Sequence, residues 1–91
     1  MLELKDFSSY KDEERILCWK HYTEKNGCEY EADFSICFNP KKDDAWYQII
    51  VGACTDDNFE EIMHIDFYKI KDAIKWWNEN IPEEGEIRWE I

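Results

Sequence analysis

The clearest pattern along the chain is an alternation of apolar and polar residues in two neighbouring segments, 29–38 and 45–54. A period of two is typical of β-strands that bury one face. The segment between them is polar and contains Pro40, which indicates a turn, so the two strands are expected to form an antiparallel hairpin. Pairing Phe38 with Ala45 keeps both apolar sets on one face of this hairpin. The pairs that follow from this register are Ile36 with Tyr47 and Phe34 with Ile49.

A helix is predicted near the C-terminus, over residues 68–80, because apolar residues recur there at helical spacing. Asp72 and Lys75 lie on its polar side. Pro82 prevents continuation and biases the preceding residue away from helical geometry. The apolar stripe consists of Phe67, Ile70, Ala73, Ile74, Trp77 and Ile81.

Three further segments have shorter strand patterns. A third strand is expected at about 59–66, after the polar turn 55–58, and a short strand is expected at the C-terminal end. A similar but briefer pattern at the N-terminus indicates one more strand. The apolar positions behind these predictions are Met63 and Ile65, then Ile87, Trp89 and Ile91, and finally Leu2 and Leu4.

The segment 9–25 fits two different elements. As a helix it would have Ser8 or Ser9 as its N-cap, acidic residues in its first turn, and Asn26-Gly27 at its end. As a strand it would form a hairpin with Asn26-Gly27 as a two-residue turn. The apolar face of this helix would be broad, but the capping residues and the order of charges are those expected at the two ends of a helix. The helix is therefore the favoured prediction. The strand alternative would pair Trp19 with Phe34, Leu17 with Ile36 and Lys20 with Asp33.

Either interpretation of 9–25 gives the same fold class. We expect an α+β fold in which an antiparallel sheet of three to five strands is packed by the C-terminal helix, with a second helix over 9–25 near the N-terminus. The 91 residues are enough for one domain, 1–91, with one modest core.

Charge then limits what the chain can bind. There are 22 Asp and Glu against 11 Lys and Arg, which gives a formal net charge of −11. Such a chain repels phosphates and anionic lipids, so direct binding of nucleic acid or of a membrane surface is not expected. Disorder is not expected either, because 44% of the residues are hydrophobic and 16% are aromatic.

The N-terminal residues lack the basic start and apolar stretch of a signal peptide, and no segment is apolar enough to span a membrane. A cytoplasmic protein is therefore expected. Its four cysteines would then be reduced thiols.

The residues that most often carry chemistry are sparse. Cys18 and His21 form a C-x-x-H pair, but Cys28 and Cys37 do not supply the second short-spaced pair of a structural zinc site. Nucleophilic, phosphate-binding and calcium motifs are missing from the sequence, and its acidic surroundings would raise the pKa of a thiol. We expect no enzyme activity, no catalytic residues, no metal site and no cofactor.

With no motif for chemistry, the candidate functional features are the dense negative charge and the aromatic residues. Glu29, Glu31 and Asp33 share the polar face of one predicted strand, at a spacing of about 6.6 Å that is comparable to that of backbone phosphates. Such a row can mimic nucleic acid and occupy a basic groove. Further expected contact residues are the acidic turn residues Asp56 and Asp57 and an interface anchor, Trp76.

In its small size, acidity and lack of motifs the chain resembles small bacterial or phage inhibitors, such as toxin immunity proteins and anti-defence proteins. The resemblance rests on composition and implies a binding protein that blocks a basic partner, expected to be a nucleic-acid-handling enzyme. Two alternatives stay open: a small-molecule- or zinc-binding domain that uses the cysteines, and a structural subunit that self-associates through Trp46 or Trp76. The sequence does not specify an oligomeric state.

Overall fold

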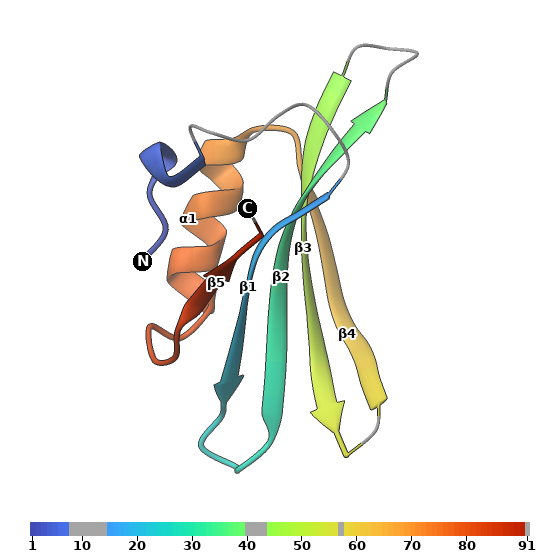
Figure 1. Cartoon of the computed structure of the whole chain (residues 1–91), viewed down its shortest axis with the longest axis vertical. Helices are drawn as coiled ribbons and strands as arrows, with labels where there is room; N and C mark the ends of the chain where they lie inside the picture. Colours follow the sequence, from blue (N-terminus) through green and yellow to red (C-terminus); the bar gives the residue numbers. More distant parts are fainter. Residues whose placement is uncertain (8–14, 40–43, 57, 91) are drawn as a thin grey trace.

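A computed structural model describes residues 1–7, 15–39, 44–56 and 58–90. Five antiparallel strands form one sheet in the order β4-β3-β2-β1-β5, and one α-helix packs on one of its faces (Figure 1). The expected α+β class and antiparallel sheet are confirmed. The elements are η1, a 3-10 turn (Leu4–Phe7), β1 (Arg15–Thr23), β2 (Glu29–Asn39), β3 (Asp44–Thr55), β4 (Asn58–Phe67), α1 (Ile70–Asn80) and β5 (Ile87–Trp89).

The β2–β3 hairpin has the predicted register. Phe38 pairs with Ala45, and Phe34 pairs with Ile49. Burial and the turn specify the same register here, because a slip by one residue would turn every apolar side chain toward solvent. The third strand, the C-terminal helix and the C-terminal strand also lie where the sequence predicts them, although α1 begins at Ile70 rather than at residue 68.

The predicted helix over 9–25 is wrong for the residues that the structure describes, because residues 15–23 form β1. A register shift between Ile16 and Cys18 interrupts the alternation of this strand. The interruption brings both Leu17 and Cys18 into the buried cluster, and the charged Lys20 is also buried. These three features conceal the period of two that would have indicated a strand.

The register expected for the strand alternative is also wrong, by one residue. Trp19 lies opposite Asp33, and Cys18 lies opposite Phe34. The reason is the turn: the Glu24 N–H donates to the Cys28 carbonyl, so three residues rather than two form the loop, and the last of them, Gly27, has φ +84°. A three-residue loop with glycine in the left-handed region shifts the pairing accordingly.

The expected N-terminal strand is absent from residues 1–7, which contain the 3-10 turn instead. Leu2 is buried against α1, because the Asn78 side chain accepts a hydrogen bond from the Leu2 N–H at 2.8 Å and donates one to its carbonyl at 2.9 Å. The N-terminal residues therefore complete the helix layer and leave the order of the sheet unchanged.

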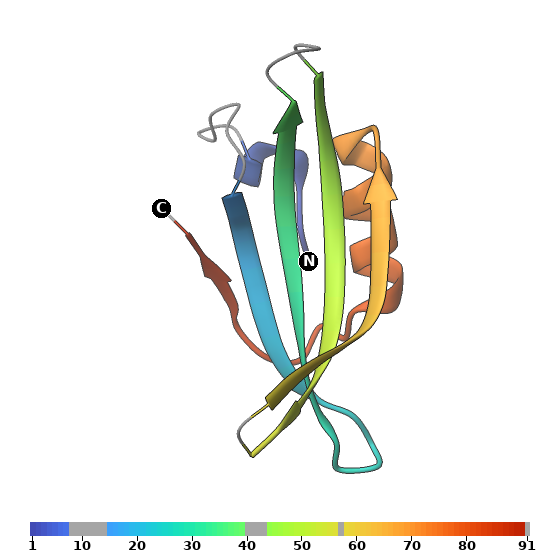
Figure 2. The ribbon, with the colours of Figure 1, turned by 90° about the vertical axis from the view of Figure 1, so that its right-hand side faces the viewer.

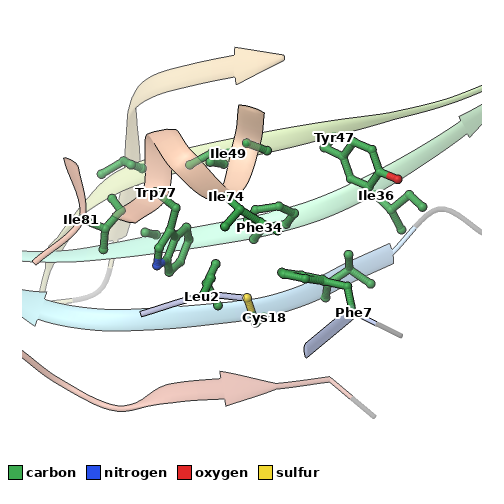
Figure 3. Close-up of a cluster of buried hydrophobic side chains, with 14 of the residues drawn as sticks. Leu2, Phe7, Cys18, Phe34, Ile36, Tyr47, Ile49, Ile74, Trp77 and Ile81 are labelled. Atoms are coloured by element: carbon green, nitrogen blue, oxygen red, sulfur yellow. The ribbon is translucent and has the colours of Figure 1, made fainter. Parts of the chain in front are cut away.

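The core lies between the sheet and this helix layer (Figure 3). Trp77 of α1 is 1% exposed and packs against Phe34, with ring centroids 6.0 Å apart. Phe7 packs on the same Phe34 at 4.9 Å and also on Trp89 at 5.3 Å. The amphipathic stripe of α1 is thus directed into the sheet, as its apolar spacing predicts.

The opposite face of the sheet carries no helix in the part of the chain that the structure describes (Figure 2). We call it the outer face. Within the same residues, no helix is long and apolar enough to span a membrane.

Candidate functional site

The outer face carries the acidic row that the sequence predicts. Glu29, Glu31 and Asp33 alternate along β2, on the side opposite the buried Ala32 and Phe34. Because β2 is the central strand, this row has neighbours on both sides. The residues opposite the row are Thr23, His21 and Trp19 of β1, and Cys54, Gly52 and Ile50 of β3.

Beside this row the outer face is hollowed into a cavity of about 380 Å³. It is lined by one aromatic ring, two basic side chains and two carboxylates. These residues come from β1, β2, β5 and the segment before β5, and they meet because the edge strand β5 pairs with β1. The lining residues are Trp19, His21, Glu31, Glu86 and Arg88.

The strongest electrostatic feature of the site is the pair of carboxyl groups on Glu31 and Asp33. Partial burial, the negative charge of Glu31 and a hydrogen bond to the Glu31 carboxyl raise the pKa of Asp33 from 3.8 to about 7. The Asp33 carboxyl therefore stays largely protonated up to near-neutral pH. Near neutral pH the row therefore carries less negative charge than its three carboxyl groups suggest.

The thiols near the site are not activated. Burial, followed by the charges of Glu31, Glu29 and Asp33, raises the pKa of the Cys54 thiol on the outer face. Burial raises the pKa of Cys18, in the core, to about 12. Both groups are protonated at neutral pH, and a protonated thiol is a poor nucleophile and a poor metal ligand.

The C-x-x-H pair does not form a chelating unit. Cys18 pairs with Phe34 on the core face, whereas His21 pairs with Glu31 on the outer face. The two side chains therefore point to opposite sides of the sheet. Among the described residues, no group of three or more histidine, cysteine or acidic side chains could hold a metal ion.

The other predicted contact residues differ in where they lie relative to the acidic row. Asp56 is exposed in the turn after β3, at the end of the sheet where Glu29 pairs with Cys54. Asp57 lies outside the described residues. Trp76 is half-buried on the core side, where its ring packs on Phe67 at 6.4 Å. It is therefore separated from the acidic row by the sheet.

Four residues that line the cavity were not predicted from the sequence, namely Trp19, His21, Glu86 and Arg88. Trp19 and His21 belong to the strand that was expected to be a helix, and Arg88 reaches them only because β5 adds to β1. The signal that could have found the first two is the strand alternative for 9–25, read with a three-residue turn instead of a two-residue turn.

Comparison of the chain with protein-family models, with curated proteins and with solved structures found no match.

Proposed function

We propose that this protein is a non-catalytic binding protein whose outer face occupies a basic surface of a nucleic-acid-handling protein and thereby blocks it. The observation that supports this proposal is the row of Glu29, Glu31 and Asp33 on the central strand, on a face with no covering helix among the described residues. Side chains at alternate strand positions are about 6.6 Å apart, so a basic groove that accepts phosphates can accept this row.

Electrostatics gives the proposal its mechanism. The net charge of −11 accelerates encounter with a basic surface, and the row aligns the two surfaces once they meet. Blocking then needs no chemical step, because the bound protein occupies the place of the nucleic acid. This mechanism agrees with the protonated state of the Cys54 thiol.

Trp19 replaces Trp76 as the proposed aromatic anchor. It is half-buried, lines the cavity on the outer face and lies directly opposite Asp33. Tryptophan is enriched among the residues that dominate binding energy at protein interfaces. A lysine or arginine of the partner that enters the cavity would meet both an aromatic ring and the carboxylate of Glu31.

Affinity capture from a lysate of the source organism tests the proposal. The protein is immobilised at low salt and eluted first with a salt gradient and then with duplex DNA. The proposal predicts that one basic nucleic-acid-binding protein is retained and that DNA displaces it. Retention that ignores both salt and DNA would contradict it, and dimers in light scattering would favour the self-association alternative.

A further inference from the structure

The two edges of the sheet differ in a way that the proposed function does not use. β5 forms one edge and has only three residues, whereas β4 forms the other edge and has ten. Within the described chain, β4 pairs only with β3, so the backbone groups on its other side have no strand partner. Exposed edges are usually blunted by short length, charged side chains, proline or a β-bulge. β4 is long and contains no proline, lysine or arginine, so apart from His64 its charged residues are acidic, and a register shift against β3 leaves one residue, Ile62, without a partner.

Large apolar side chains are exposed along this edge. Phe59 is 46% exposed, Ile62 is 55% exposed and Met63 is 42% exposed. The Phe59 ring lies over Gly52, where a Cβ would clash with the ring. The absence of a side chain at residue 52 thus leaves room for an aromatic ring on the outer face at the border of the sheet.

The edge is also negatively charged. Glu60, Glu61 and Asp66 are exposed, and His64 is the one residue of β4 that can carry positive charge. Its Nδ1 lies 3.3 Å from the Glu61 carboxylate and its Nε2 lies 3.2 Å from that of Asp66. A second copy of this chain is a poor partner for β4, because it would bring an identical acidic edge and another net charge of −11.

We infer that the β4 edge takes an extended, basic segment of a partner protein as a sixth strand. Main-chain hydrogen bonds to β4 would supply affinity, and lysine or arginine side chains on the outer face would lie beside Glu61 and Asp66. Apolar side chains of the same segment would cover Ile62 and Met63. The inference rests on the proposed function for the sign of the partner's charge, but the β4 edge and the acidic row are separate surfaces.

A peptide of ten alternating lysine and valine residues, matched to the length of β4, is the probe. We expect it to bind the full-length protein and to slow amide hydrogen exchange in β4 while leaving exchange in β5 unchanged. A second peptide has proline in place of each valine. It keeps the charge but cannot pair as a strand, so it is expected to bind at least about tenfold more weakly.

Two matched protein variants separate strand pairing from charge. Ile62→Lys places a lysine within the edge, whereas Tyr68→Lys adds the same charge just beyond it, at a side chain that is 86% exposed. Ile62→Lys is expected to weaken binding of the peptide by about tenfold, and Tyr68→Lys by less than about threefold. Should Ile62→Lys not fold, the proline peptide still decides the question.

Four results would overturn the inference: no binding of the lysine–valine peptide, binding without protection of β4 amides, equal weakening by the two variants, or a dimer formed through β4. Failure of the proposed function has a different signature. In that case lysate capture retains no basic protein, while the peptide still protects β4.

Discussion

At the residue scale, the raised pKa of Asp33 beside Glu31 links stability to pH. The pKa of Asp33 is about 7 in the folded protein, against an ordinary value of 3.8. A carboxyl whose pKa rises on folding binds its proton more tightly in the folded state. Its contribution to stability is therefore complete below about pH 4 and is lost as the pH rises toward about 7.

Asp33→Asn removes this dependence, because the amide stays neutral. We expect the variant and the natural protein to differ little at pH 4.5. At pH 8.5 the variant is expected to be more stable by on the order of 1 kcal/mol, since water screens the half-exposed site. Urea unfolding across this pH range measures the difference, with Glu29→Gln at the exposed end of the row as the control. A difference that does not change with pH would contradict the raised pKa of Asp33.

Lys20 is a second charged residue whose environment is unusual, since it is 2% exposed. Its Nζ donates to the Pro82 carbonyl at 2.6 Å and to the Glu83 carbonyl at 3.3 Å, and burial lowers the pKa of the amine. The buried ammonium thus fixes the segment between α1 and β5 to the sheet.

Lys20→Met keeps the apolar length of this side chain but leaves the two carbonyls without their donor. We expect a loss of about 2 kcal/mol in the free energy of unfolding, because hydrogen bonds from charged groups are among the stronger ones. Lys75→Met, at a side chain that is 74% exposed, is the control and should change stability by less than about 0.5 kcal/mol. Equal losses in the two variants would show that Lys20 has no special role.

At the scale of elements, the connection between α1 and β5 depends on Gly85. This residue has φ +93°, and a Cβ there would lie 2.8 Å from the His21 carbonyl oxygen of β1. Gly27 in the β1–β2 turn has φ +84° but open space around it. Substituting each glycine therefore distinguishes the stability cost of backbone strain alone from that of strain combined with a steric clash.

Gly27→Ala is expected to cost about 1 kcal/mol, which is typical of a non-glycine residue in the left-handed region. Gly85→Ala is expected to cost at least about 2 kcal/mol, because the clash with backbone cannot be relieved by rotating a side chain. Thermal unfolding of the two variants in parallel measures both values. A smaller loss for Gly85→Ala than for Gly27→Ala would contradict the close packing against β1.

An element could be predicted from the sequence where its local residue pattern and its packing in the fold require the same structure. The β2–β3 hairpin is the clearest case, since its alternation and its turn both require Phe34 to face Ile49. β1 could not be predicted in the same way. Its irregularity near Leu17 and its buried Lys20 break the pattern, and the partners that stabilise it are distant in sequence.

The part of the site that could be predicted from the sequence is the part that lies on a single strand. Glu29, Glu31 and Asp33 belong to one strand, so alternation alone places them on one face. The cavity beside them needs β1 and β5 to meet across a long sequence separation, as in the pair of Trp19 with Arg88. A pairing of this kind depends on tertiary packing, and no local pattern encodes it.

At the scale of the whole molecule, the structure divides the chain into a packed face and an acidic face. The helix layer covers one side of the sheet, and the outer face carries the central acidic row (Figures 1 and 2). With a net charge of −11, any binding to a basic partner will depend on salt. The useful question is therefore whether a particular face, rather than total charge, determines affinity.

Two double charge reversals with the same change in formal net charge answer that question most directly. Glu31→Lys with Asp33→Lys alters the outer face, whereas Asp72→Lys with Glu79→Lys alters the exposed side of α1, on the other side of the sheet. Affinity for the captured basic protein is measured over a range of salt concentrations. We predict that the outer-face variant binds at least about a hundredfold more weakly and with a flatter salt dependence, while the helix variant changes affinity by less than about threefold. Equal effects of the two variants, or no effect of the first, would contradict the assignment of the outer face as the binding surface.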